Sequence, residues 1–201
     1  MYYFKMNSST IKYIILIPLF CGILFSFKTN ENDFEWTVIK VVKAFKEKDA
    51  STLNGLINND IGLIVLFRRG SPDEFSRTDK VDFKKPVPEY LPYFDFSTDY
   101  KIEYRTLPIF DCDSMKWSKT GIYCDTTQID CLLSTTAQHL EAYKGVKVPD
   151  SEIEEFIKIE NKSRRIVLAD NDGGELIFYL TLINNKWYLT ILDRVSSDCS
   201  A

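Results

Sequence analysis

The spacing of apolar residues predicts two helices at the start of the folded part of the chain. Over residues 33–48 the apolar positions recur every three or four residues, which is typical of one helix face. Asn32 or Asp33 is placed to cap this helix. Residues 51–57 continue the spacing and predict a second, shorter helix that ends at residues 58–60. The residues expected to face the core are Phe34, Val38, Val41, Val42, Phe45, Leu53, Leu56 and Ile57.

The middle of the chain mixes short strands, an irregular segment and two helices. The uninterrupted apolar residues 61–67 predict a buried strand. Between Arg69 and Thr98, prolines and charged residues break every pattern, which predicts a long loop with one short helix around residues 88–93. The remaining elements expected here are strands at 101–105 and 121–124, a helix from Asp125 or Thr126 to Tyr143 that ends at Gly145, and a helix that begins with the capping box Ser151 to Glu154 and turns Ile153, Phe156 and Ile157 inward.

Three consecutive strands are predicted at the end of the chain. Residues 165–169, 175–183 and 187–195 are rich in apolar residues, and short turns separate them, which predicts an antiparallel meander. The middle strand is apolar on both faces, so it is expected to be central and covered on both sides. In the last strand Asp193 ends an apolar stripe and is expected at a solvated strand end, because unpaired buried carboxylates are rare.

The start of the chain is typical of an export signal. Lys5 and Lys12 precede an apolar run, residues 13–27, that is shorter than the roughly 20 residues of a comfortable membrane crossing. A signal peptide over residues 1–26, cleaved after Ser26, places the protein in the periplasm or outside the cell. Two alternatives stay open: an uncleaved membrane anchor formed by residues 13–27, and lipidation at Cys21.

Composition limits the partners of the mature chain. Residues 27–201 are enough for a single α+β domain, with an irregular insertion at about 70–100. Loss of the signal makes the formal charge of −4 two units more negative, and no basic run offers a surface for nucleic acid. The pairs Arg68-Arg69 and Arg164-Arg165 are interpreted as solvated strand ends. Membrane contact is expected only through an uncleaved N-terminal segment.

The cysteines indicate disulfide bonds and no metal site. Cys112, Cys124, Cys131 and Cys199 form an even set in a compartment that permits disulfides, and three full pairings are open. Two bridges would tie the middle of the chain to its C-terminus. The short Cys pairs of structural zinc sites are missing, and a single histidine, His139, excludes any site with several histidines. No cofactor is expected.

Two stretches resemble the nuclear transport factor 2-like superfamily. They are Val41-x-x-Ala-Phe-Lys-Glu-Lys-Asp-Ala50 followed by Leu53-x-x-Leu-Ile57, and Lys186-Trp-Tyr-Leu-Thr-Ile191. The resemblance covers residues 33–67 and 163–195. It implies N-terminal helices packed on a curved, mainly antiparallel sheet, which together form a cone with an apolar pocket. The ending from Asp193 onward is similar to uncharacterised exported bacterial proteins.

The leading functional hypothesis is a non-catalytic exported domain that binds a small apolar ligand or an envelope protein. The chain has no G-x-S-x-G, Walker or G-x-G-x-x-G motif, and its many aromatic residues suit a pocket or a contact surface. The alternative is an isomerase or hydrolase-like enzyme of small substrates that uses a pocket carboxylate. Ligand-binding candidates are Tyr90, Tyr93, Phe94 and Tyr188, which can equally pack on the core, and catalytic candidates are Asp193, Tyr104 and His139.

Overall fold

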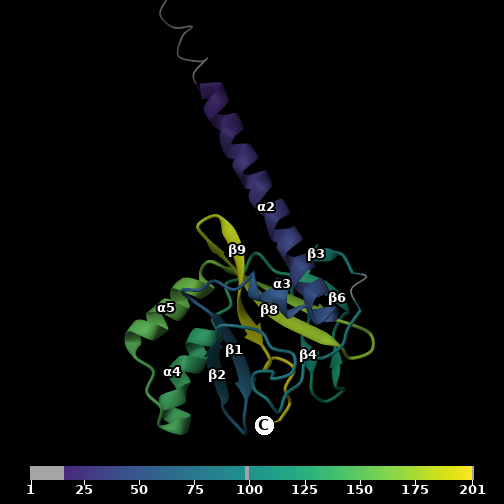
Figure 1. Cartoon of the computed structure of the whole chain (residues 1–201), viewed down its shortest axis with the longest axis vertical. Coiled ribbons are helices and arrows are strands. Elements are labelled where there is room, and N and C mark those ends of the chain that lie inside the picture. The colour runs from purple at the N-terminus through teal and green to yellow at the C-terminus, as the bar shows by residue number, and fades with distance from the viewer. Residues whose placement is uncertain (1–15, 98–99, 201) are drawn as a thin grey trace, which may run out of the picture.

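A mixed β-sheet forms the centre of the molecule, and helices cover both of its faces (Figure 1). The computed structural model describes residues 16–97 and 100–200. Within them, seven strands form the main sheet in the order β2-β1-β9-β8-β7-β6-β3, and β4 and β5 form a small separate sheet. The strands are β1 Leu63–Arg68, β2 Asp73–Thr78, β3 Ile102–Tyr104, β4 Phe110–Asp111, β5 Lys116–Trp117, β6 Gly121–Cys124, β7 Ser163–Ala169, β8 Glu175–Ile183 and β9 Lys186–Asp193. The helices are α2 Leu16–Lys46, α3 Ala50–Asn54, α4 Leu132–Lys144 and α5 Asp150–Glu160.

The sheet is mainly antiparallel, so the predicted α+β class is confirmed. Only β1 with β9 and β3 with β6 run parallel among the pairs of the described main sheet. The three C-terminal strands pair in chain order, β7 with β8 and β8 with β9, both antiparallel. β9 therefore lies between β8 and β1 and joins the end of the chain to its first strand.

Helix α2 is longer than the sequence pattern predicts. It spans 31 residues, and its first half projects away from the sheet (Figure 1). Asn32 and Asp33 lie inside it, so the predicted cap is wrong. The helix continues through these residues because the sequence between Gly22 and Asp33 contains no proline or glycine that would end it. The expected signal boundary after residue 26 also falls within α2, and residues 1–15 lie outside the described residues. No helix in the described ranges has both the length and the apolar character needed to cross a membrane.

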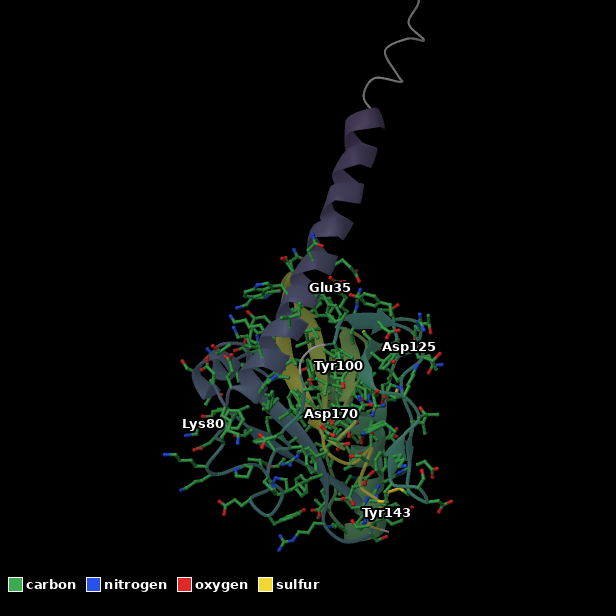
Figure 2. The ribbon with its side chains drawn as sticks, turned by 90° about the vertical axis from the view of Figure 1, so that its right-hand side faces the viewer. Glu35, Lys80, Tyr100, Asp125, Tyr143 and Asp170 are labelled. Atoms are coloured by element: carbon green, nitrogen blue, oxygen red, sulfur yellow. A yellow bond between two sulfur atoms is a disulfide. The ribbon has the colours of Figure 1, made fainter. Side chains whose placement is uncertain are left out.

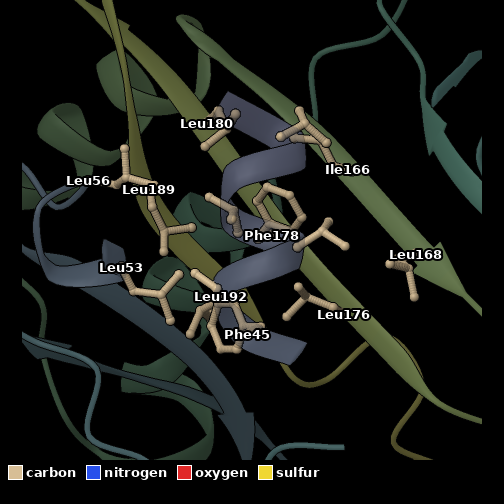
Figure 3. Close-up of a cluster of buried hydrophobic side chains, with 14 of the residues drawn as sticks. Phe45, Leu53, Leu56, Ile166, Leu168, Leu176, Phe178, Leu180, Leu189 and Leu192 are labelled. Atoms are coloured by element: carbon tan, nitrogen blue, oxygen red, sulfur yellow. The ribbon is translucent and has the colours of Figure 1, made fainter. Parts of the chain in front are cut away.

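The second half of α2 packs its apolar stripe on one face of the sheet (Figure 3). The predicted stripe is confirmed, because all of its residues from Phe34 to Phe45 are buried. They contact the alternate β8 residues Leu176, Phe178 and Leu180, as the two-residue period of a strand requires. The short helix α3 is capped by Asp49, whose carboxylate accepts a hydrogen bond from the Thr52 N–H at 3.0 Å. It adds Leu53, and the turn after it adds Leu56 and Ile57, as expected.

Helices α4 and α5 cover the opposite face of the sheet. Their buried side chains pack on Ile64, Leu66, Tyr179 and Ile191, which alternate with the residues that face α2. The side chains that α4 and α5 contribute are Leu133, Ala137, Leu140, Phe156 and Ile159.

Helix α4 ends as predicted, but both helices begin differently from the prediction. α4 begins at Leu132, because Asp125 instead accepts hydrogen bonds from Thr127 in a local turn. It ends at Gly145, whose φ of 67° is the left-handed cap that glycine favours. α5 begins directly after Pro149, so the predicted capping box is wrong, and Ile157 is 40% exposed while Ile159 faces the core.

The irregular segment contains a strand that the sequence pattern did not predict. β2 pairs antiparallel with β1 over six positions. It is an edge strand in which Phe75 is the one apolar residue, so it lacks the apolar alternation that identifies a strand. The short helix expected at residues 88–93 is replaced by turns with a cis Val87–Pro88 peptide bond.

One disulfide fixes the C-terminal tail. Cys112, next to β4, bonds to Cys199 across a sequence separation of 87 residues. The second expected bridge is not formed: within the described chain Cys124 is a buried free thiol in β6 and Cys131 is an exposed free thiol before α4. Burial raises the pKa of the Cys124 thiol to about 12. The tail is thus joined to the β4–β5 hairpin instead of being loose.

Alkylation of the native protein should distinguish the four cysteines. Iodoacetamide without reductant should label Cys131 and leave Cys124 unlabelled, because a buried thiol with a raised pKa supplies almost no thiolate. Peptide mapping should recover Cys112 and Cys199 as a linked pair. Reduction should then lower the free energy of unfolding by roughly 4–5 kcal/mol, from the loop that the bridge closes. Labelling of Cys124 as fast as Cys131, or a Cys124–Cys131 linked peptide, would contradict this assignment.

Candidate functional site

A cavity lies at the end of the sheet where β8 begins and β9 ends. Its volume is about 560 Å³. Leu176, Ile177 and Leu192 form its floor, segment 90–96 forms one wall, and the tail residues 197–200 form another. Figure 1 shows the C-terminus at the end of the molecule opposite the projecting half of α2. The cavity, which the tail lines, therefore lies away from the projecting half of α2, whereas Phe45 near the other end of this helix lines it.

Three of the four predicted ligand-binding aromatics meet in this cavity. Tyr90, Tyr93 and Phe94 all line it. Tyr90 and Phe94 remain 54% and 52% exposed, so their rings are available to a ligand. Tyr93 also packs edge-on against Phe45 with ring centroids 5.3 Å apart, so it joins the cavity wall to the core. Tyr188 does not belong to the site: its ring lies under the Lys186 ammonium on β9.

Arg194 is the central polar group of the wall. Its Nη1 donates to the carbonyl oxygens of Val87 and Leu91 at 3.1 and 2.6 Å, and its Nη2 donates to that of Pro92 at 2.6 Å. The guanidinium also lies 4.7 Å from the centre of the Tyr93 ring. Burial lowers the pKa of Arg194 to about 10, so the group is still charged at neutral pH. It holds segment 87–92 against the end of β9.

Two further charged residues complete the wall. Glu175, at the start of β8, accepts hydrogen bonds from Trp117 Nε1 at 3.0 Å and from the Ser197 hydroxyl. Burial raises the pKa of this carboxyl group. Arg68 pairs with Asp73 at 2.7 Å and donates to the carbonyl oxygen of Asp198 at 2.5 Å. Both residues therefore attach the C-terminal tail to the sheet.

Asp193 is buried, and the predicted solvated position is wrong. Its side chain has no exposed surface. One carboxylate oxygen accepts from Arg165 at 2.6 Å and from the Ser196 hydroxyl at 2.7 Å, and the other accepts from two backbone N–H groups. Arg165 bonds to Asp130 as well, at 2.7 Å, so the expectation of a solvated Arg164-Arg165 pair is also wrong. With its acceptor positions occupied, Asp193 serves the fold.

The other catalytic candidates lie elsewhere. The Tyr104 hydroxyl donates to Glu35 at 3.1 Å, and burial raises the pKa of this tyrosine. Glu35 lies near the point where α2 leaves the body, whereas Tyr143, the neighbour of His139 on α4, lies toward the other end (Figure 2). His139 lines a separate, smaller cavity of about 260 Å³. The structure does not bring Tyr104, His139 and Asp193 together.

The described residues offer no evident metal centre. Within the ranges 16–97 and 100–200, no group of three or more His, Cys, Asp or Glu side chains is arranged to hold a metal ion. The polar groups of the cavity are instead two guanidinium groups, carboxylates engaged in hydrogen bonds and the hydroxyl groups of the tail.

The sequence pattern did not reveal Arg194, Glu175 and Arg68 as site residues. All three stand where an apolar strand begins or ends, and charged residues at such positions are usually solvated. Comparison with models of known families, with curated proteins and with solved structures finds no match.

Replacement of Asp193 tests its structural role. Asp193→Ala should lower the free energy of unfolding by about 3–5 kcal/mol, because it leaves the charge of Arg165 buried beside a single remaining aspartate. Asp172→Ala is the matched control, since Asp172 is exposed in the β7–β8 turn, and it should change stability by no more than about 0.5 kcal/mol. Urea unfolding measures both. Equal stability of the two variants would show that the Asp193 ion pair contributes little.

Proposed function

We propose that the protein binds a small, mainly apolar molecule in the cavity at the end of the sheet. The observation that carries the proposal is the cavity itself: its volume of about 560 Å³ is within the range of small-molecule sites. Its lining combines an apolar floor, exposed aromatic rings and a few polar groups, which is the usual composition of such sites. Binding there requires no chemistry from the protein.

The architecture around the cavity supports this proposal. Arg194 holds segment 87–92, and Arg68, Glu175 and the Cys112–Cys199 bridge hold the tail, so both walls are attached to the sheet. A preformed site loses less conformational entropy when a ligand binds. The proposal also agrees with the apolar pocket that the nuclear transport factor 2-like resemblance implies. The proposed place of action is the periplasm or the cell exterior, as the signal-like start of the chain predicts.

The enzymatic alternative has less support. A general base needs a free acceptor within reach of the substrate, and the Asp193 carboxylate is fully engaged by Arg165, Ser196 and two backbone N–H groups. Tyr104 and His139 do not line the cavity.

Binding of a neutral fluorescent probe tests the proposal. N-phenyl-1-naphthylamine should bind saturably, with increased fluorescence, because the cavity is apolar and accessible. Phe94→Ala should weaken its affinity about 5–30-fold, the effect of losing about 1–2 kcal/mol of apolar contact. Trp36→Ala is the matched control, since Trp36 is a similarly exposed aromatic on α2 outside the cavity, and it should leave the affinity unchanged. Absence of saturable binding, or equal losses in the two variants, would refute the proposal.

A further inference from the structure

We infer that the ligand of this cavity carries a carboxylate, which Arg194 binds, while its apolar body lies against Phe94, Leu176 and Leu192. This inference rests on the proposed function and specifies the chemical class of the ligand. It follows from the charge and the hydrogen-bonding capacity of Arg194, taken together with the apolar floor beside it.

Arg194 differs from the other partly buried arginines because no described carboxylate forms an ion pair with it. Arg68 pairs with Asp73, Arg164 with Glu31, and Arg165 with Asp130 and Asp193, all within 3.0 Å. Among the described side chains, no carboxylate oxygen lies within 4.0 Å of the Arg194 guanidinium. Its partners are three neutral carbonyl groups. Glu175 attracts this guanidinium only from beyond ion-pair distance. A partly buried cation without a direct ion pair is unfavourable, so an anion bonded to it would be stabilising.

The guanidinium also has hydrogen-bonding capacity to spare. It carries five N–H donors, and the three carbonyl groups occupy both donors of Nη1 and one of Nη2. The Nε–H and one Nη2–H remain, and these two nitrogens share one edge of the planar group. A carboxylate can accept from two such nitrogens at once, which makes the fork of an arginine selective for this group.

The acidic residues of the wall are each engaged by other groups, so the position beside Arg194 is open to an anion. Asp193 is paired with Arg165. Asp198 accepts from the backbone N–H and the hydroxyl of Ser200. Both oxygens of Glu175 are engaged, by Trp117 and Ser197. The apolar residues Leu176 and Leu192 then remain for the body of the ligand.

A series of ligands that differ only in the head group tests the inference on the unmodified protein. Decanoate, decanol and decylamine should each displace N-phenyl-1-naphthylamine at pH 7.5, because they share one apolar chain. Decanoate should bind at least about 10-fold more tightly than decanol, the effect of a charged hydrogen bond of about 1.5 kcal/mol or more, and decylamine should bind most weakly. If decanol or decylamine binds as tightly as decanoate, the inference is wrong while the proposed function stands. If the fluorescent probe itself does not bind, the proposed function fails.

A pair of arginine variants assigns the preference to Arg194. In Arg194→Gln the ratio of decanoate to decanol affinity should fall to about one. Arg105→Gln is the control, since Arg105 is an exposed arginine outside the cavity, and it should keep the ratio of the unmodified protein. A ratio unchanged in Arg194→Gln would overturn the assignment. Because Arg194 also holds segment 87–92, circular dichroism should first show that the variant is folded; if it is not, the head-group series on the unmodified protein decides.

Discussion

Strand β9 has to fit between β1 and β8, and the rest of the fold depends on this placement. It runs parallel to the first strand of the chain and antiparallel to β8, so it joins segments that are far apart in sequence. Both of its faces are buried: Leu192 packs toward α2 and Ile191 packs toward α4 and α5. β9 therefore contributes to the core on each face of the sheet. Loss of β9 would expose both cores.

The residues at the end of β9 also have partners on different sides, and these contacts form part of the cavity. Asp193 pairs with Arg165, whereas the next residue, Arg194, bonds to the carbonyl groups of segment 87–92. The end of β9 is therefore bonded both to β7, through Asp193, and to a wall of the cavity, through Arg194. The tail beyond is fixed by Arg68 and by the Cys112–Cys199 bridge. Fold stability and the shape of the proposed site consequently depend on adjacent residues.

Local patterns predicted the elements that are defined locally. The stripe from Phe34 to Phe45, the strand after residue 61 and the cap at Gly145 follow from spacing and backbone preference, and each was found. β2 could not be predicted, because its mostly polar residues show no apolar alternation and are ordered by pairing with β1. In the site, the aromatic rings between Tyr90 and Phe94 were predicted from composition. Arg194 was not, because its burial results from contacts with residues about a hundred positions earlier.

The account centres on a cavity at the end of the sheet that admits an apolar molecule. Amide chemical-shift mapping during titration with decanol tests this most directly, since the probe is uncharged and the readout has residue resolution. The account predicts that the shifts concentrate at residues 90–96, 176–177 and 192–200, which line the cavity. Shifts centred on the exposed side chains Trp36 and Ile39 of α2, or no shifts at all, would contradict it.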